Sequence, residues 1–378
     1  MSAGMRAGYK QTEVGVIPED WEVRYLADVS QKITDGDHVT PARTAHGYYL
    51  LSARNVLNGR IDVSDVDYVG FDEYQRMKQR CGPEAGDILI SCSGTIGRVA
   101  VVPSGFECVL VRSAALAKID SDLADGVFLQ FWLQGRKAQA QIASSVNQGA
   151  QPNLFLNHIE RLVCPHPPLP EQRAIGAALS DLDALLGGLD SLMAKKRDLK
   201  QAAMQQLLTG QIRLPGFSEG WEVTPLASIA DVLKGSALSK SLTTTAGARH
   251  CILYGELFTT YGRVISEVFG RTNSSEGCPS TNGDVLMPGS TTTTGIDLAT
   301  ASMNDVALGG DIIIIRRKGK AYDPVFLANY LTQVKRNKIA ELTQGITIHH
   351  LYGKDLKTLE LELPLVSEQT AIAEVLSD

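Results

Sequence analysis

The sequence lacks any stretch that would place the chain across a membrane. No run of 18 apolar residues occurs among its 378 residues, and about that length is needed for a helix to span a bilayer. The segment from Met1 to Tyr9 holds no apolar core of the signal-peptide kind. We therefore predict a cytoplasmic protein with no membrane contact.

Cysteine is scarce, and its distribution excludes the common zinc-binding patterns. The six cysteines form no CxxC pair, and none lies at a zinc-type spacing from a histidine. The adjacent His349 and His350 would point to different sides of a helix or strand, so they do not form a metal pair. We predict no metal site and reduced, mostly buried thiols at Cys81, Cys92, Cys108, Cys164, Cys251 and Cys278.

An excess of positive charge is also missing. The net charge is −6, which divides into −3 for residues 1–170, +1 for residues 171–213 and −4 for residues 214–378. No segment is a basic arm of the kind that binds nucleic acid. If the chain binds DNA, local basic clusters or partner subunits must neutralise much of the phosphate charge.

Nucleotide-binding and metallohydrolase motifs are absent as well. There is no GxxxxGK[ST] phosphate loop, no GxGxxG after a predicted strand and no HExxH. Residues 310–320 are basic but lack the spacing of a phosphate loop. Nothing in the sequence nominates a catalytic centre.

What the sequence does contain is a repeat of about 200 residues. Six short segments recur in the same order in both halves, at a nearly constant offset. Chance matches would not stay colinear, so the chain holds two copies of one domain, each followed by the same kind of helix. Matched residues include Trp21 and Trp221, Asp87 and Asp284, Phe128 and Phe326, and Gln172 and Gln369.

Between these anchors the two copies differ, which indicates one scaffold carrying two different surfaces. Short apolar runs bounded by Gly, Pro and Ser predict strands at residues 87–91, 109–119 and 311–316. The spacing of apolar residues predicts amphipathic helices at residues 127–141 and 325–342. The predicted fold class is therefore α/β, of the mixed α+β kind, with many loops.

Residues 171–209 are predicted to form one long helix between the two copies. Pro170 stands where a helix can begin, and Gly210 and Pro215 end it. Apolar residues in it recur at alternating steps of four and three, which is a coiled-coil seam. The seam residues are Ile175, Leu179, Leu182, Leu186, Leu189 and Met193. The alternative interpretation is a long core helix inside one globular domain.

Taken together, these segments resemble the specificity subunits of type I DNA restriction-modification systems. The run from Pro165 to Ile175 is similar to the family's Pro-Leu-Pro-Pro-Leu-x-Glu-Gln-x-x-Ile, and residues 363–369 keep part of it in the second copy. Residues 207–213 resemble the end of the family's central helix, and residues 17–23 resemble the entry to a target-recognition domain. The resemblance covers essentially the whole chain.

The resemblance implies a target-recognition domain at residues 1–168, a central spacer helix at 169–213, a second recognition domain at 214–365 and the start of a distal helix at 366–378. Each domain would read one half of a split, asymmetric target in double-stranded DNA. The helices would set the half-site distance and dock methyltransferase subunits, which restriction subunits join. The complex would use S-adenosylmethionine, ATP and Mg²⁺, whereas this chain would bind no cofactor and hold no catalytic residue. In line with this, it lacks the Asn/Asp-Pro-Pro-Phe/Tyr motif of adenine methyltransferases.

Candidate DNA contacts lie on polar loops, because polar side chains read base edges and basic ones hold phosphates. The candidate base contacts are Asp35, His38 and Thr40 in one loop, Ser93, Thr95 and Arg98 in a second, and Ser290, Thr292 and Thr293 in the counterpart of the second. The candidate phosphate contacts are Arg316, Lys318 and Lys320, with a further cluster at Arg76, Lys78 and Arg80. The alternatives are a polar turn, a plain strand connection and ordinary solvated charges.

The second conserved helix is short in this sequence. It begins at Glu368 and the sequence stops at Asp378, whereas the first runs from Glu171 to Arg213. An uncovered seam is a liability or an interaction site, so we expect a truncated chain or a seam that pairs with another chain, including self-association through the central helix. The alternative functions are a truncated regulatory or inactive fragment that binds methyltransferase without assembling a working enzyme, and an unrelated enzyme on a duplicated fold.

Overall fold

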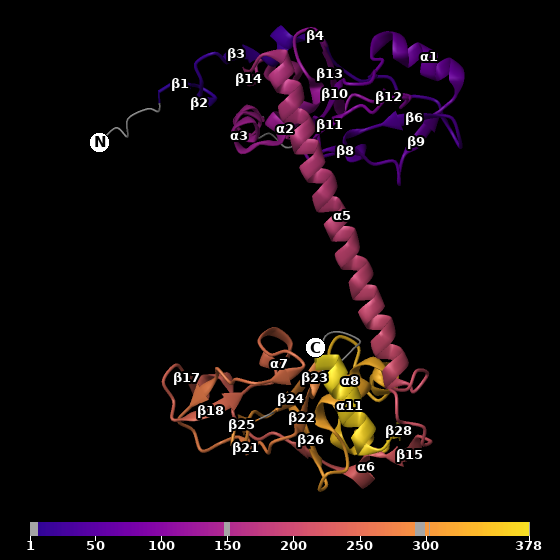
Figure 1. The fold of residues 1–378 in the computed structure, drawn as a ribbon, viewed down its shortest axis with the longest axis vertical. Helices are drawn as coiled ribbons and strands as arrows, with labels where there is room; N and C mark the ends of the chain where they lie inside the picture. Colours follow the sequence, from indigo (N-terminus) through magenta and orange to yellow (C-terminus); the bar gives the residue numbers. More distant parts are fainter. Residues whose placement is uncertain (1–6, 147–151, 292–298, 302, 378) are drawn as a thin grey trace. The chain divides into compact units, whose positions relative to one another are not determined.

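The computed structural model describes residues 7–146, 152–291, 299–301 and 303–377. The chain divides into two compact units, unit 1 (Met1–Ser191) and unit 2 (Leu192–Asp378). A single 40-residue helix, α5 (Leu169–Leu208), begins in unit 1 and ends in unit 2 (Figure 1). The predicted mixed α/β class, with two copies and a long central helix, is confirmed.

Unit 1 is built in four layers. A first sheet, in the order β11-β10-β13-β4, is covered on one face by α2, and its other face packs on a second sheet, in the order β12-β6-β9-β5. Helix α1 covers the outer face of the second sheet through Tyr74 and Met77. The elements are β1 (Tyr9–Thr12), β2 (Gly15–Pro18), β3 (Glu22–Tyr25), η1 (Leu26–Val29), β4 (Ser30–Asp35), β5 (Arg43–Thr44), β6 (Tyr48–Leu51), η2 (Ala53–Asn55), β7 (Val56–Leu57), β8 (Arg60–Ile61), β9 (Asp67–Val69), α1 (Phe71–Arg80), β10 (Ile88–Ser91), β11 (Val99–Val101), β12 (Cys108–Leu110), β13 (Ala114–Ile119), α2 (Gly126–Gln134), α3 (Arg136–Ser145), α4 (Leu156–Glu160) and β14 (Val163–His166).

Unit 2 repeats the inner layers. Its first sheet, in the order β16-β26-β22-β24-β19, is covered on one face by α8, α11 and the end of α5, and its other face packs on the sheet β17-β20-β18-β25-β21. The elements are β15 (Glu222–Pro225), α6 (Leu226–Ile229), β16 (Ala230–Lys234), η3 (Lys240–Leu242), β17 (Thr243–Thr244), β18 (Arg249–Ile252), α7 (Glu256–Thr259), β19 (Val264–Ile265), β20 (Arg271–Thr272), β21 (Cys278–Pro279), β22 (Asp284–Pro288), β23 (Ser290–Thr291), β24 (Ala299–Ala301), β25 (Ala307–Leu308), β26 (Ile312–Arg317), α8 (Pro324–Gln333), α9 (Arg336–Glu341), β27 (His349–His350), α10 (Gly353–Leu356), β28 (Glu360–Leu363) and α11 (Val366–Ser377).

Three of the predicted elements are divided in the structure. The strand predicted at residues 109–119 is wrong as one strand, because the chain turns after Leu110 and passes from the second sheet (β12) to the first (β13). The helix predicted at residues 127–141 breaks at Gly135, whose backbone is extended. The helix predicted at residues 325–342 also divides, into α8 and α9, but here the two residues between them, Val334 and Lys335, have no extended backbone.

Helix α5 lies within two residues of its predicted start and one of its predicted end. Residues 181–200 are all exposed, so the alternative of a buried core helix is wrong. Only the two ends are anchored: Ile175 packs on the core of unit 1, and Leu207 and Leu208 are buried in the core of unit 2. Within the described ranges, no helix combines the length and apolar character that a membrane span requires.

The cysteines are free thiols, and five of the six are buried, as predicted. Burial raises the pKa of Cys81, Cys92, Cys108 and Cys164 to about 12, so these sulfurs stay protonated and unreactive. Across the described residues, no group of three His, Cys, Asp or Glu side chains is arranged to hold a metal ion.

Candidate nucleic-acid interface and helix attachment

The first candidate loop follows β4 and is held by its own polar side chains. The Asp35 carboxylate lies 2.6 Å from His38 Nε2 and accepts a hydrogen bond from Arg80 at 3.1 Å. The structure therefore brings Asp35 and His38 together as a pair. His38 is about half exposed and Thr40 is exposed, so these two side chains remain accessible to a ligand.

Asp37 is the central residue of this loop, and sequence reasoning missed it. It is 8% exposed, and its carboxylate forms an ion pair with Arg76 at 2.5 Å and accepts a hydrogen bond from the Val39 N–H. Burial alone would raise the pKa of Asp37, but these bonds outweigh it and hold the pKa below its ordinary value. Arg76, one of the candidate phosphate contacts, is thus already paired inside unit 1.

The second candidate loop joins β10 to β11. Ser91 closes it: its hydroxyl donates to the Thr95 carbonyl at 2.6 Å and accepts from the Arg98 N–H at 2.9 Å. Ser93 forms an isolated bridge with Asn153, Thr95 is exposed, and Arg98 is half-buried. A serine directly after a buried strand was the available signal for this turn, but it does not specify the partners.

The counterpart loop in unit 2 starts at β23. Ser290 Oγ lies 2.9 Å from His350 Nδ1, because β23 pairs antiparallel with β27. Thr292 and Thr293 lie outside the described residues. The two adjacent histidines are therefore a strand that pairs with this loop.

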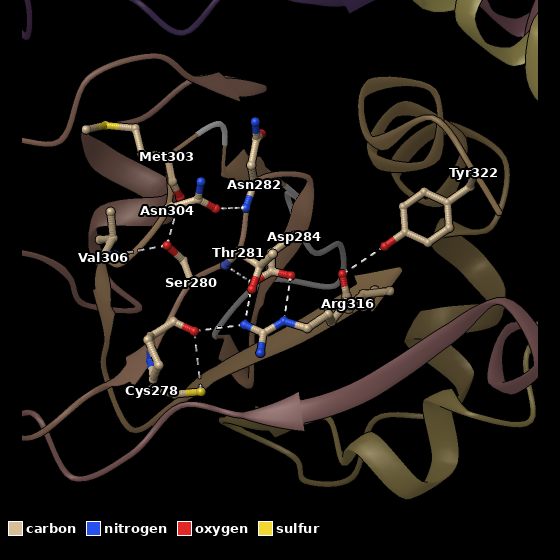
Figure 2. A network of polar contacts seen from close by, with 12 residues as sticks. Cys278, Ser280, Thr281, Asn282, Asp284, Met303, Asn304, Val306, Arg316 and Tyr322 are labelled. Carbon is tan, nitrogen blue, oxygen red and sulfur yellow. Dashed lines mark hydrogen bonds and ion pairs between the residues drawn. The ribbon is translucent and has the colours of Figure 1, made fainter. Parts of the chain in front are cut away.

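Arg316 belongs to a buried network rather than to an open basic surface. Figure 2 shows its guanidinium against the carboxylate of Asp284, with bonds of 3.0 and 2.7 Å from Nε and Nη2. Asp284 is 1% exposed and also accepts from the Thr281 N–H, while Arg316 donates to the Pro279 carbonyl. This geometry gives Arg316 a structural role in joining β26 to β22.

The same arrangement occurs in unit 1, where Asp87 takes the place of Asp284. Asp87 accepts hydrogen bonds from the Glu84 and Ile119 N–H groups and lies 3.8 Å from Lys118. The strand registers place Lys118 and Arg316 at equivalent positions. Burial raises the pKa of Asp87 despite these bonds.

The remaining basic candidates are more accessible. Lys318 is 45% exposed and bonds the Ala227 carbonyl at 2.7 Å, with Asp231 at 3.4 Å, and Lys320 is exposed. Lys78 lies over the ring of Tyr74. Of the candidate basic residues in unit 2, Lys320 and Lys318 are therefore placed best to meet a phosphate.

A buried glutamine attaches α5 to unit 1. The Gln172 side chain is fully buried; its Oε1 accepts from the Asp125 N–H at 2.9 Å, and its Nε2 donates to the Pro167 carbonyl at 2.8 Å. Asp125 is itself the N-cap of α2, where its carboxylate accepts from the Phe128 N–H. We call this set of contacts the unit 1 clamp.

Unit 2 has the same clamp at the start of α11. Gln369 is 1% exposed; it accepts from the Asp323 N–H at 3.0 Å and donates to the Pro364 carbonyl at 2.9 Å. Asp323 caps α8 through the Val325 and Phe326 N–H groups. The repeated Glu-Gln dipeptide was visible in the sequence, but the N-capping aspartates that each glutamine bonds, more than 40 residues away, were not.

The glutamate before each glutamine has different partners in the two units. Glu368 is 2% exposed and forms two short hydrogen bonds, of 2.6 and 2.7 Å, with the guanidinium of Arg213 beyond the end of α5. Glu171 is exposed and accepts one bond from Trp21 Nε1 at 3.1 Å. In unit 2 the glutamate before the clamp thus forms a buried ion pair with Arg213, whereas in unit 1 the equivalent glutamate has a single exposed hydrogen bond.

The outer halves of the two units also differ. In unit 1, α1 packs on Leu50, Val69 and Val109. The strand registers make Cys251 and Ala307 the counterparts of Leu50 and Val109, and among the described residues of unit 2 their outer face is covered by Leu238 and not by a helix. A cavity of about 1150 Å³ opens beside it; its lining includes Lys240, Thr243, Thr244, Tyr254, Phe269 and Arg271.

The central seam is present as an exposed apolar stripe on α5. Ile175 and Leu179 are half-buried on unit 1, whereas Leu182, Leu186, Leu189 and Met193 are 48–58% exposed. Leu185, Leu192 and Leu199 widen the stripe and are as exposed. Such a stripe is apolar surface for which the described part of the chain supplies no cover.

Comparisons with known proteins place this arrangement in a family. The model of the type I restriction modification DNA specificity domain matches residues 18–190 and again residues 218–378. The chain is 26% identical over 382 residues to the putative type I restriction enzyme MjaX specificity subunit of Methanocaldococcus jannaschii, covering 97% of this chain and 88% of that protein. It is 22% identical to the type I restriction enzyme EcoBI specificity subunit of Escherichia coli over 52% of this chain and 43% of the relative.

Solved structures share the fold. A chain from a structure of the type I R-M system matches with a TM-score of 0.62 at 18% identity, covering 96% of this chain and 90% of that one. The HsdS subunit from Thermoanaerobacter tengcongensis matches with a TM-score of 0.53, also at 18% identity, covering 96% and 89%. At these identities the likeness concerns the fold alone.

Proposed function

Because the chain belongs to the type I restriction-modification DNA specificity family, we propose that it reads a bipartite, asymmetric target in double-stranded DNA. Unit 1 reads one half-site and unit 2 reads the other. The chain acts in the cytoplasm as a non-catalytic subunit that docks methyltransferase and restriction subunits. S-adenosylmethionine, ATP and Mg²⁺ are bound by those partners.

The observation that carries this proposal is the duplicated scaffold with unlike outer halves. The buried aspartates and the clamps repeat residue for residue. The outer face is covered by α1 in unit 1, whereas among the described residues of unit 2 it is covered by Leu238, beside a cavity. Two readers with the same frame and different surfaces suit a target whose two halves differ. A single enzyme active site would not require such a duplication.

Helix α5 suits the role of a spacer. Its 40 residues amount to about 60 Å at ~1.5 Å per residue, and one turn of DNA is about 34 Å. The hydrogen-bonded helix does not stretch, so its residue count would set a fixed number of base pairs between the half-sites. The accessible candidates for base and phosphate contact are His38, Thr40, Thr95, Lys318 and Lys320.

Reconstitution with the cognate methyltransferase tests this proposal. We expect site-specific adenine methylation only when both proteins are present, and a lower rate when His38 and Thr40 are replaced by alanine. Methylation by the methyltransferase alone, or by this chain alone, would overturn it. Binding that suppresses methylation would instead support the alternative of a regulatory or inactive fragment.

We also propose that the exposed stripe of α5 is an interface, for methyltransferase or for a second copy of the chain. The stripe is nearly palindromic about Leu189: in an antiparallel pair, Leu186 lies level with Leu192, and Leu185 lies level with Met193. The apolar residues of the two copies then meet.

A polar substitution in the stripe tests self-association. Leu189→Lys should weaken the dimer in light scattering, because it places a charge between the two apolar stripes, and Leu189→Met should leave the dimer intact. A chain that stays monomeric at every concentration contradicts the second copy as occupant. A methyltransferase complex that forms on the same stripe would then identify the other occupant.

A further inference from the structure

The two clamps are the most closely repeated polar contacts in the described parts of units 1 and 2. In each, one buried amide accepts from the N-cap residue of a helix and donates to a proline carbonyl. Buried polar groups are normally paired, because leaving one unpaired costs free energy. Each of the two amides meets that requirement by bridging two separate segments of its unit.

The unit 1 clamp fixes the orientation of α5 as well as its contact with unit 1. Asp125 lies at the start of α2, whereas Pro167 lies just before α5 itself, so the two bonds tie the first turn of α5 to a second element of unit 1. An amide is planar, and its hydrogen bonds are directional. A helix turn bonded to both segments at once cannot rotate about its own axis without breaking one of the bonds.

The next turn of the helix packs as closely. A Cβ added to Gly176 would lie 3.0 Å from the Asp125 carboxylate and 3.2 Å from the Phe128 nitrogen. The helix surface therefore rests directly on the start of α2. Ala373, at the matching position of α11, is 5% exposed.

We propose that Gln172 and Gln369 are positioning residues that fix the direction in which each conserved helix leaves its DNA-reading unit. The inference rests on the proposed function, since the direction matters only if the helices set the distance between half-sites. Each amide acts through the helix it holds and does not itself contact DNA. An apolar side chain of similar size fills the same space but leaves the helix free to turn.

The test replaces Gln172 by leucine in the full chain and measures methylation with the cognate methyltransferase. The substrates carry the native target and the same target with the spacer one base pair longer or shorter. We expect Gln172→Leu to lower the preference for the native spacer by about tenfold or more, since a misplacement of reacting groups by about 1 Å can lower a rate by about a hundredfold. Gln369→Leu should act in the same direction.

Gln141 provides a matched control. Its amide makes the same pair of backbone bonds, both to Val163, but within unit 1 and away from α5. Gln141→Leu should lower thermal stability and leave the spacer preference unchanged. The proposal is overturned if Gln172→Leu keeps the spacer preference, or if both variants lose it equally. A wild-type chain that supports no methylation of a split target contradicts the proposed function instead, and is recognised before any variant is made.

Discussion

Unit 1 and unit 2 are alike where the helices attach and unlike at their outer faces. The inner halves share the clamp, the N-capping aspartate and a buried aspartate that holds a cation on the neighbouring strand. Among the described residues, the outer halves share their strands and differ in what lies on them: α1 covers one, and a cavity opens beside the other. The comparison separates residues that build the shared scaffold from residues that differ between the two units.

The outer halves can differ because they are separate from the main core of each unit. Helix α1 is held by a small cluster that includes Tyr74 and Met77, distinct from the cluster that joins α2 to the first sheet. The described residues of unit 2 include no counterpart of α1, and the larger core of unit 2 is complete without it. The shared scaffold of the two units therefore accommodates a whole helix in one unit and a different covering in the other, as expected of segments that lie at the surface.

The largest expected effect concerns the buried aspartates. Asp284→Ala should lower the free energy of unfolding of unit 2 by about 3–5 kcal/mol, because it leaves a partly buried arginine without its partner. Asp87→Ala should lower the free energy of unfolding of unit 1 by less, because its cationic partner, Lys118, lies 3.8 Å away. Amide hydrogen exchange in β22 and β26 measures the effect of Asp284→Ala on unit 2, and exchange in β10 and β13 measures the effect of Asp87→Ala on unit 1. Equal loss of protection in the two units would contradict the assigned asymmetry.

The next effect tests α1, which has no counterpart among the described residues of unit 2. Met77→Ala should destabilise unit 1 by about 2–3 kcal/mol through the cavity that it leaves. We expect faster exchange in β6 and β12 and no change in β18 or β25. Faster exchange in unit 2 would show that the outer halves are coupled.

The glutamates beside the clamps should respond unequally. Glu368→Gln should cost about 2 kcal/mol, since it removes the charge from two bonds to Arg213. Glu171→Gln, at an exposed site, should cost less than about 0.5 kcal/mol. Chemical denaturation of each variant gives the two values. A reversed order would mean that the exposed bond to Trp21 is the stronger attachment.

The smallest effect is a pH dependence confined to the unit 1 clamp. His166 Nδ1 lies 3.3 Å from the Gln172 amide nitrogen. The pKa of His166 is lowered by burial and, to a smaller extent, by the nearby charge of Arg24. Unit 2 has Leu363 at the equivalent position, which does not titrate. His166 therefore binds a proton more tightly in the unfolded chain than in the folded one. The contribution of neutral His166 to the free energy of unfolding is complete above about pH 6.5 and is lost as the pH falls below that value. His166→Leu should reduce the fall in unit 1 stability between about pH 7 and about pH 5.5. The same fall in wild type and variant would exclude His166 as its source.

The features of the fold that could be predicted from the sequence are those set by residues close together in the chain. The seam spacing and the flanking Pro170 and Gly210 placed α5, and the colinear repeat placed two copies of one scaffold. The break at Gly135 was missed because the apolar spacing continues across it. Helix α1 was missed because it is short and buries only Tyr74 and Met77.

The candidate site was harder to predict, because its pairings are long-range. A sequence shows that Arg316 and Arg76 are basic, but not that Asp284 and Asp37 already neutralise them. Folding brings these charges together from segments about 30 to 40 residues apart. Short polar residues such as Thr40 and Thr95 were placed correctly on exposed loops, and their contact with DNA remains a prediction.

Two unlike readers in one chain should specify two unlike half-sites. The decisive measurement maps adenine methylation across DNA from cells that contain the cognate methyltransferase, with and without this chain. We expect a split motif with two different halves and a fixed spacer, which appears only when the chain is present. A continuous motif, a symmetric motif or a methylation pattern that is the same without the chain would contradict it.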